Sequence, residues 1–134
     1  KDLDILLVEG AGGLLVPLTE EFLMVDLISK MGIPAILVTG AGLGTVNHTL
    51  LSIEAMKKRN LKIHGIVINK MPLHPGVVEK DNIKTIERMG EIPVIAVISE
   101  FDFLMKNKDF ADCQKDEFAN FAHELFSSFK DADF

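Results

Sequence analysis

The sequence lacks tryptophan and tyrosine altogether and has a single cysteine, Cys113, among its 134 residues. One cysteine excludes an internal disulfide and a zinc site built from several thiolates, and it fits a reducing compartment. No apolar run reaches the roughly 20 residues that span a membrane, and no secretory signal pattern opens the sequence. The 20 acidic residues outnumber the 14 basic ones, which argues against a basic face for duplex nucleic acid. We therefore expect a cytoplasmic protein that binds neither a membrane nor a nucleic acid.

Short apolar runs, in contrast, are abundant. Four runs rich in Ile, Val and Leu follow one another along the chain, at Leu3–Val8, Ile33–Thr39, Ile63–Asn69 and Ile92–Ile98. They do not alternate cleanly between apolar and polar residues, which is typical of strands covered on both faces. Segments with helical spacing separate them, at about 20–31, 46–59 and 77–89. Strand, helix and strand in this order form βαβ units, so the sequence predicts an α/β fold with a mainly parallel sheet and helices on both faces.

The last part of the chain predicts one more helix, at about 115–130. Between Phe118 and Phe129 the apolar residues recur at steps of three and one, which is the stripe of an amphipathic helix. Asp116 and Glu117 suit the positive N-terminal end of such a helix. We expect this helix to close the chain by packing on the sheet, and binding of a partner is the alternative.

Ligands of open parallel sheets bind at the carboxyl ends of the strands, so the residues that follow each predicted strand are the site candidates. After the first strand the chain reads Glu9, Gly10, Ala11, Gly12, Gly13. A carboxylate is an oxygen ligand of the kind that Mg²⁺ takes, and glycines let backbone N–H groups approach an anion closely. The alternative is a tight turn in which Glu9 only caps a helix. Asp26, within an apolar stretch further on, is either exposed on a helix or part of the site.

A second glycine-rich segment follows the second predicted strand. It runs from Gly40 to Thr45 and leads into a helix, so it is placed to hold an anion at the helix N-terminus. It is not the dinucleotide fingerprint G-x-G-x-x-G, because Thr45 stands where the last glycine would be. The phosphate loop G-x-x-x-x-G-K-[ST] is absent from the sequence as well. The third strand ends at Asn69, whose amide offers a donor beside an acceptor, as an adenine edge requires; an ordinary turn asparagine is the alternative.

Five segments taken together resemble the dethiobiotin synthetase family. They are VEGAGGLLVPL, the VDL that holds Asp26, PAILVTGAGLGTVNHTLL, GIVINK and GEIP, in this order and spacing over about residues 3–98. The resemblance implies a P-loop NTPase-like fold, of which residues 1–134 form the C-terminal part of a single nucleotide-binding domain. It also implies that the phosphate loop and the catalytic residues lie in an N-terminal half outside these 134 residues, and that this chain alone is inactive.

The resemblance further implies a reaction and a set of binding residues. The family closes the ureido ring of dethiobiotin from 7,8-diaminononanoate, CO₂ and ATP with Mg²⁺, as a homodimer. By resemblance, Glu9 is a magnesium ligand, and the carbamate and γ-phosphate are lined by Gly10, Ala11, Gly12 and Gly13. The substrate carboxylate is held, across the dimer interface, by Leu43, Gly44 and Asn47. Adenine is bound by Asn69, helped by the backbone near Pro93.

The sequence departs from the family at one position. Well-known members use a tyrosine beyond a Pro-Gly turn to bind the substrate carboxylate; here the turn Pro75-Gly76 is present, but Asp81 stands near the tyrosine position. A carboxylate cannot hold another carboxylate without a cation, and Lys80 is a candidate replacement. Two other interpretations remain open: a related ATPase of the P-loop superclass, of the cobyrinate-amidating or partitioning type, and a non-enzymatic fragment that binds a partner.

Overall fold

The computed structural model describes residues 6–10 and 12–100 of the chain. The order of the elements is α1 (Met24–Met31), β1 (Ala35–Gly40), α2 (Thr45–Lys57), β2 (Ile63–Met71), α3 (Val77–Gly90) and β3 (Val94–Ser99). The helix expected at about 115–130 lies outside the described residues. The described helices have eight to fourteen residues, and none of them is long and apolar enough to cross a membrane.

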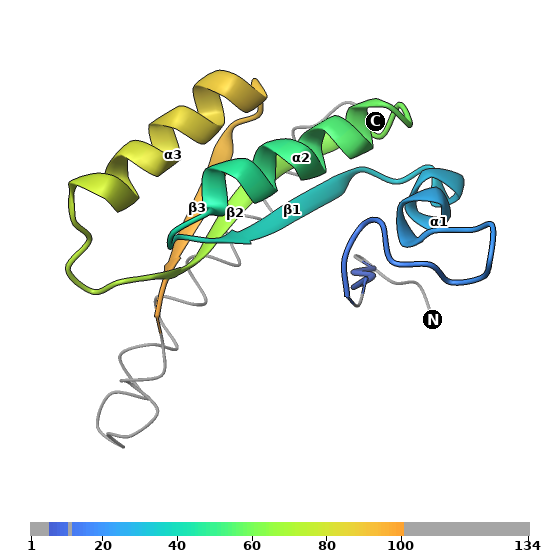
Figure 1. Ribbon diagram of the computed structural model, residues 1–134, viewed down its shortest axis with the longest axis horizontal. Helices are drawn as coiled ribbons and strands as arrows, with labels where there is room; N and C mark the ends of the chain where they lie inside the picture. Colours follow the sequence, from blue (N-terminus) through green and yellow to red (C-terminus); the bar gives the residue numbers. More distant parts are fainter. Residues whose placement is uncertain (1–5, 11, 101–134) are drawn as a thin grey trace, which may run out of the picture.

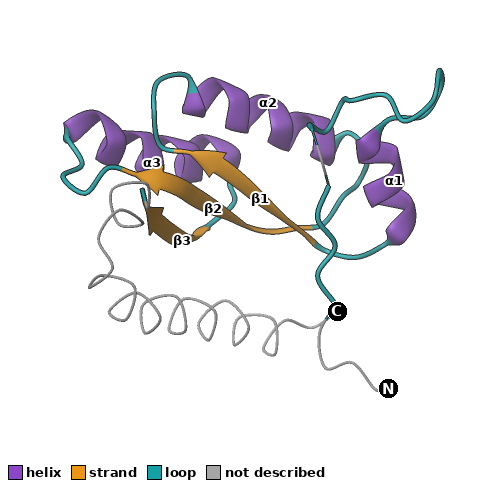
Figure 2. Ribbon diagram, turned by 90° about the horizontal axis from the view of Figure 1, so that it is seen from below, coloured by secondary structure: helices purple, strands orange, loops and turns teal. Residues whose placement is uncertain are grey.

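Within the described residues, three parallel strands form a sheet in the order β1-β2-β3. Leu37 of β1 is opposite Ile66 of β2, and Ile66 is in turn opposite Val94 of β3. Helices α2 and α3 connect successive strands and lie next to each other on one face of the sheet (Figures 1 and 2). The predicted α/β fold with a parallel sheet is therefore confirmed. The part of the chain that the structure describes places both of these helices on the same face.

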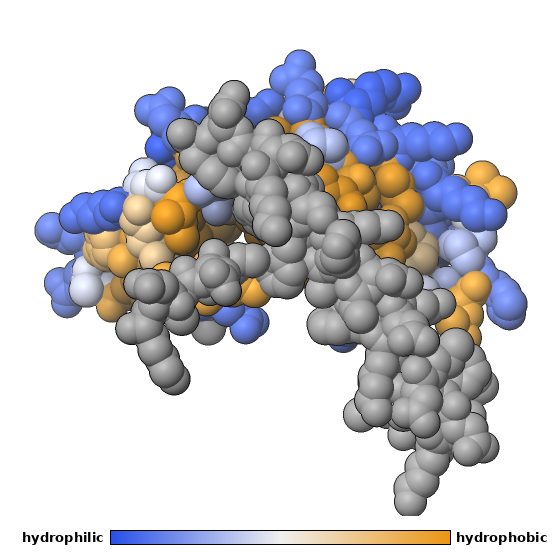
Figure 3. Space-filling view, turned by 180° about the vertical axis from the view of Figure 1, so that it is seen from behind, coloured by the Kyte–Doolittle hydropathy of each residue, from blue (hydrophilic) through white to orange (hydrophobic). Residues whose placement is uncertain are grey.

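The core lies between that face of the sheet and the two helices. Ile66 and Ile68 of β2 are buried against Ile53 of α2 and Ile86 of α3. Full burial of each such side chain contributes roughly 1.5–3 kcal/mol. The opposite face, seen in Figure 3, carries hydrophobic residues as well. Val38 of β1 belongs to this face, because its neighbours Leu37 and Thr39 face the helices, and it is 59% exposed.

The strand expected at Leu3–Val8 is not present over its described part. Residues 6–8 have no strand conformation, and Leu6 and Leu7 are largely exposed. A strand forms only where a neighbouring strand pairs with its backbone groups. Among the described strands β1 pairs only with β2, so residues 6–8 have no strand beside them. The prediction was therefore wrong for residues 6–8, and the earlier residues lie outside the described part.

Helix α1 begins later than its apolar spacing predicts, at Met24 in place of about residue 20. The amides of Leu18 and Thr19 both donate to the Phe22 carbonyl, which keeps this segment in a turn. The first helical amides, those of Met24 and Val25, donate back to the preceding loop at the Val16 and Leu14 carbonyls (2.9 and 2.8 Å). These bonds satisfy helix donors that would otherwise lack partners, so they fix where the helix starts.

Candidate functional site

The carboxyl end of β1 leads into a glycine-rich loop that ends at α2. Gly44 has φ +87°, a left-handed conformation that a residue with a side chain rarely adopts, and it immediately precedes the first helical residue, Thr45. Leu43, at the tip of the loop, is fully exposed. The Asn82 amide nitrogen donates to the Ala41 carbonyl at 3.3 Å, which ties the loop to α3. The loop is therefore anchored to α3 at Ala41 and to α2 at Gly44, while the side chain of Leu43 is exposed to solvent.

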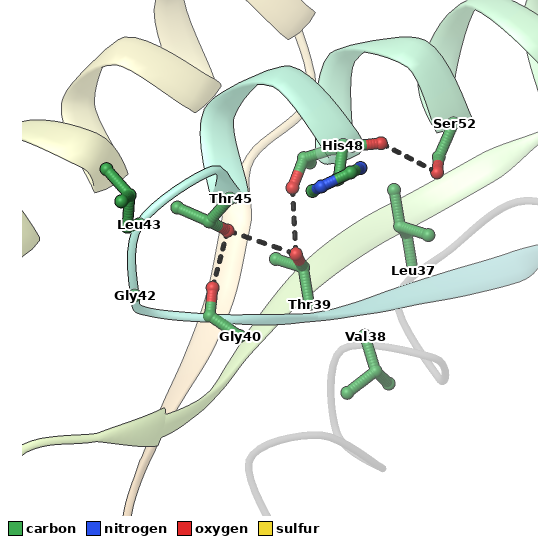
Figure 4. Close-up of a pocket in the computed structure, with 10 residues that line it drawn as sticks. Leu37, Val38, Thr39, Gly40, Gly42, Leu43, Thr45, His48 and Ser52 are labelled. Atoms are coloured by element: carbon green, nitrogen blue, oxygen red, sulfur yellow. Dashed lines mark hydrogen bonds between the residues drawn. The ribbon is translucent and has the colours of Figure 1, made fainter.

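A chain of hydroxyl groups holds the start of α2 against β1 (Figure 4). Thr49 Oγ1 donates to Thr39 Oγ1 at 2.9 Å, Thr39 and Thr45 Oγ1 are 3.1 Å apart, and Thr45 Oγ1 donates to the Gly40 carbonyl. Because the Thr45 proton is used on Gly40, Thr39 must be the donor to Thr45. Thr45 and Thr49 are buried, and the hydroxyl of each of the three threonines has a hydrogen-bond partner within this network.

These threonines line one wall of an open pocket of about 410 Å³ along β1 and the first half of α2. Leu37 forms the apolar part of its lining on the side of β1 that faces α2, and His48 and Ser52 contribute from α2 (Figure 4). The Ser52 hydroxyl donates to the His48 carbonyl at 2.8 Å, so its proton is already used within the helix. The pocket thus combines an apolar strand surface with polar groups near a helix N-terminus.

The N-terminus of α2 differs from those of α1 and α3. Asp26 accepts a hydrogen bond from the Leu23 amide in α1, and Glu79 accepts one from the Gly76 amide in α3 (2.9 and 2.8 Å). Helix α2 has neither a side-chain cap at Gly44 nor an acidic residue in its first turn. The partial positive charge of this helix end is therefore not balanced by a carboxylate of its own first turn. The arrangement is suited to an external anion.

The carboxyl end of β2 has an irregular backbone. The register passes from Ile68 opposite Val97 to Met71 opposite Ser99, so two residues of β2 stand against one of β3. The two residues are Asn69 and Lys70; Lys70 has φ +57°, and its amide donates to Asn69 Oδ1 at 2.8 Å. The Asn69 amide is thus held by the backbone at the edge where parallel sheets bind ligands.

The structure brings together some of the residues that the sequence singled out. Leu43, Gly44, Asn47 and Asn69 all lie at the carboxyl ends of the strands, and Lys80 and Asp81 are exposed near the start of α3. Pro93 does not join them, because it precedes β3 and its carbonyl accepts from the Ile66 amide (2.9 Å), three residues before Asn69. At roughly 3.3 Å per residue, about 10 Å of strand separates these positions.

The segment that carries Glu9 lies at the opposite end of the sheet. A side chain at Gly10 would contact Met24 of α1, and α1 sits where β1 begins (Figures 1 and 2). Glu9 itself is exposed. Among the residues that the structure describes, no group of three or more His, Cys, Asp or Glu side chains is arranged to hold a metal. The structure thus does not bring Glu9 and its glycines beside Asn69, and their role stays a prediction.

Asp26, whose role the sequence left open, has a structural partner. Arg59 Nε donates to Asp26 Oδ1 at 2.7 Å, and each side chain is about 30% exposed. This hydrogen bond and the one from the Leu23 amide hold the pKa of Asp26 below its ordinary value. Asp26 therefore joins α1 to the end of α2 and does not face the carboxyl ends of the strands.

Sequence reasoning missed the threonines of the pocket. Thr39 lies at the end of an apolar run, and Thr45 and Thr49 lie four residues apart in a helix, so they share one helix face. That spacing, next to a strand ending in threonine and glycine, was the available signal for a hydroxyl chain.

Comparison with known proteins gives a consistent result. A family model described as AAA domain matches residues 1–108. The ATP-dependent dethiobiotin synthetase BioD of Halalkalibacterium halodurans is 44% identical over 96 residues, 71% of this chain and 40% of that protein. The one from Thermodesulfovibrio yellowstonii is 40% identical over 116 residues, 81% of this chain and 48% of that protein. The biotin biosynthesis bifunctional protein BioCD of Bordetella avium is 46% identical over 97 residues, 72% of this chain and 20% of that protein.

These relatives confirm the resemblance inferred from the five sequence segments. The chain spans less than half the length of each of them.

Proposed function

The chain belongs to the AAA domain family, and on this premise we propose that it forms the adenine- and substrate-carboxylate-binding part of a dethiobiotin synthetase. The observation that carries the proposal is the joint position of two elements at one edge of the sheet. The uncapped N-terminus of α2 follows β1, and the backbone-held amide of Asn69 lies two residues before the end of β2. An anion site beside a polar base-reading group suits an enzyme that binds an acidic substrate together with ATP.

The proposed reaction joins CO₂ to one amine of 7,8-diaminononanoate as a carbamate. The carbamate oxygen takes the γ-phosphoryl group of ATP, which releases ADP. The second amine then attacks the carbamate carbon, phosphate leaves, and the ureido ring closes. Positioning and charge neutralisation dominate catalysis of phosphoryl transfer. This chain's residues would act by positioning, and the phosphoryl-transfer residues would lie outside it.

The substrate carboxylate would lie at the start of α2. Val46 and Asn47 are in the first helical turn, whose amides have no carbonyl four residues earlier within the helix. The left-handed Gly44 lets the chain enter the helix without a side chain over that position. Leu43, fully exposed beside the site, would be covered by a second copy of the chain if the enzyme is a homodimer.

Glu9 would supply one carboxylate oxygen to Mg²⁺, and the donor fits the ion. Mg²⁺ is commonly held through one or two carboxylates, substrate phosphates and water, so a single described glutamate is a sufficient protein contribution from this segment. When bound, the ion would neutralise charge on the phosphates of ATP. Glu9 is exposed, but the structure places it at the opposite end of the sheet from Asn69, so this role is supported by the sequence resemblance alone.

The test uses the complete gene product that carries this chain. ADP release is measured with and without 7,8-diaminononanoate and bicarbonate, and dethiobiotin is assayed by mass spectrometry. We expect ADP release that depends on the diamine. Nucleotide binding without diamine dependence would instead indicate a related ATPase, and the absence of ATP binding would indicate a non-enzymatic partner-binding fragment.

A variant connects the reaction to this chain. Gly44→Ala places a side chain on a left-handed residue and should raise the KM for the diamine acid. Its effect on the methyl ester of the same diamine should be much smaller, because the ester has no negative charge for the helix end to hold. Gly32→Ala is the matched control: Gly32 is also left-handed, at φ +66°, but ends α1 away from the site. An equal effect of Gly44→Ala on acid and ester would contradict the carboxylate assignment.

A further inference from the structure

The backbone of Lys70 is the unusual feature at the carboxyl end of β2. Of the described residues other than glycine, three have positive φ, namely Asn60, Lys70 and Glu91. Asn60 and Glu91 follow the ends of α2 and α3, where left-handed residues commonly terminate helices. Lys70 instead lies inside a strand, where this conformation interrupts the ladder.

The left-handed residue turns the peptide between Asn69 and Lys70 out of the ladder. Two residues of β2 stand opposite one of β3 at this point, and pairing resumes at Met71. The Glu100 amide donates to the Met71 carbonyl at 2.7 Å, so the strand beyond the bulge is anchored. The Lys70 amide donates to Asn69 Oδ1 in place of a neighbouring strand.

This hydrogen bond determines which way the Asn69 amide faces. A backbone N–H can bond only to the oxygen of the side-chain amide, so Oδ1 is fixed toward Lys70 and the Nδ2 group points away. Oδ1 keeps a second lone pair, and Nδ2 keeps its donors. Asn69 therefore presents a donor and an acceptor in a fixed order along its edge.

We propose that Lys70 is a positioning residue for nucleobase selection: its left-handed backbone fixes the order of donor and acceptor that Asn69 presents. This inference rests on the proposed role of Asn69 in binding adenine. Adenine offers the N7 acceptor beside the N6 donor, whereas guanine offers two acceptors, N7 and O6. With its orientation fixed, the Asn69 amide can donate from Nδ2 to N7 of adenine and accept at Oδ1 from N6. On guanine the same orientation places Oδ1 against O6, and two acceptors repel each other.

The experiment measures kcat/KM for ATP and for GTP in the complete gene product, together with equilibrium binding of both nucleotides. The ratio is informative because the two nucleotides carry the same phosphates. Any direct contact of the Lys70 ammonium with a phosphate would change both values and leave the ratio in place. Lys70→Val should reduce the ATP-over-GTP ratio about tenfold or more, since a β-branched residue resists positive φ and small misplacements in a site are costly.

Two variants separate conformation from side chain and from stability. Lys70→Gly removes the ammonium but adopts positive φ freely, so the ratio should stay close to that of the unaltered protein. Asn60→Val imposes the same conflict at the end of α2, so it should lower the melting temperature and leave the ratio unchanged. If Lys70→Val does not fold, Lys70→Thr provides a smaller β-branched side chain for the same measurement.

Asn69→Asp separates the adenine-binding role of Asn69 from the positioning role of Lys70. If Asn69→Asp collapses the ratio but Lys70→Val preserves it, the positioning role is wrong and the adenine assignment stands. If Asn69→Asp also leaves the ratio unchanged, Asn69 does not select the base and both are overturned. Loss of the ratio in Asn69→Asp and Lys70→Val, with retention in Lys70→Gly, is the expected result.

Discussion

Arg59 Nε lies 2.7 Å from Asp26 Oδ1, and this ion pair joins the short helix α1 to the end of α2. Arg59 also donates to the Ala55 carbonyl at 3.3 Å, and Ser29 of α1 donates to the Arg59 carbonyl at 3.3 Å. A helix of eight residues is too short to be stable by itself, so such tertiary contacts decide whether α1 forms.

The Asp26–Arg59 pair should make stability dependent on pH in the acid range. The pKa of Asp26 is lowered in the folded protein, so its stabilising effect is fully present above the ordinary aspartate pKa of the unfolded chain. It is lost as the pH falls from that value through the lowered folded pKa. Urea unfolding across this range should therefore show a stability difference between the unaltered protein and Asp26→Asn that is largest near neutral pH and disappears in acid.

The exposed pair Lys58–Glu54 is the matched control, because it also holds the pKa of its carboxyl down, here at Glu54. Both of its side chains are well exposed, so solvent screens the pair. Glu54→Gln should change the unfolding midpoint less than Asp26→Asn at every pH. An equal change in both variants would show that the Asp26–Arg59 pair adds nothing beyond an ordinary surface pair.

The hydroxyl chain predicts unequal effects of two similar substitutions. Thr45→Val removes two hydrogen bonds, to Thr39 and to the Gly40 carbonyl, and should cost roughly 1–2 kcal/mol of unfolding free energy. Thr49→Val removes one bond, to Thr39, and should cost about 1 kcal/mol. Denaturant unfolding checks the order, and Thr45→Ser should restore most of the loss because it keeps the hydroxyl. A larger loss in Thr49→Val would contradict the assignment of two hydrogen bonds to Thr45 and one to Thr49.

Two buried glycines should respond differently to alanine. A Cβ at Gly65 would lie within 3.0 Å of three atoms of the Ile95 side chain, so Gly65→Ala should destabilise by about 1–3 kcal/mol. A Cβ at Gly90 would approach only the terminal Cδ1 of Ile53 that closely, at 2.7 Å, and this atom can move. Gly90→Ala should therefore be much less costly in thermal unfolding. Ile95→Ala should relieve part of the defect in Gly65→Ala, and additive losses would show that the clash is not the cause.

Glu9→Gln in the complete gene product should lower turnover far more than stability. The exchange preserves shape but removes the charge of a proposed magnesium ligand, and an exposed position contributes little to folding. Titration of activity with Mg²⁺ provides the measurement, and Glu20→Gln, an exposed carboxylate in the same segment, is the control. Near-normal magnesium-dependent turnover would favour the capping interpretation of Glu9.

The parts of the fold that the sequence predicted well are those governed by local patterns. Helices α2 and α3 begin within one residue of the positions that apolar spacing predicts, since both cover the sheet with an apolar face. The start of α1 was missed because backbone bonds to Leu14 and Val16, and not periodicity, determine it. Strand β3 begins at Val94, after Pro93, because proline has no amide to donate to the ladder.

The candidate site was predictable in its types of residue but not in its spatial grouping. The glycine loop before α2 and Asn69 were identified because one follows a strand and the other lies near the carboxyl end of one, and the parallel order brings such ends together. Pro93 lies apart from this group because it precedes β3, at the amino end of the strand, and its role stays a prediction. The orientation of the Asn69 amide depends on a φ angle at Lys70, which composition does not reveal.

The strictly sequential order of the parallel strands also governs how the chain folds. Leu37 meets Ile66, and Ile66 meets Val94, so each ladder joins residues nearly thirty positions apart and has no hairpin from which to start. Closing a loop of this length costs about 3 kcal/mol in chain entropy before any ladder contact compensates. Folding should therefore be slow for so few residues, with α2 and α3 forming in concert with the strands they connect. In kinetic terms β2, which pairs with both β1 and β3, is the strand on which the described part of the sheet depends.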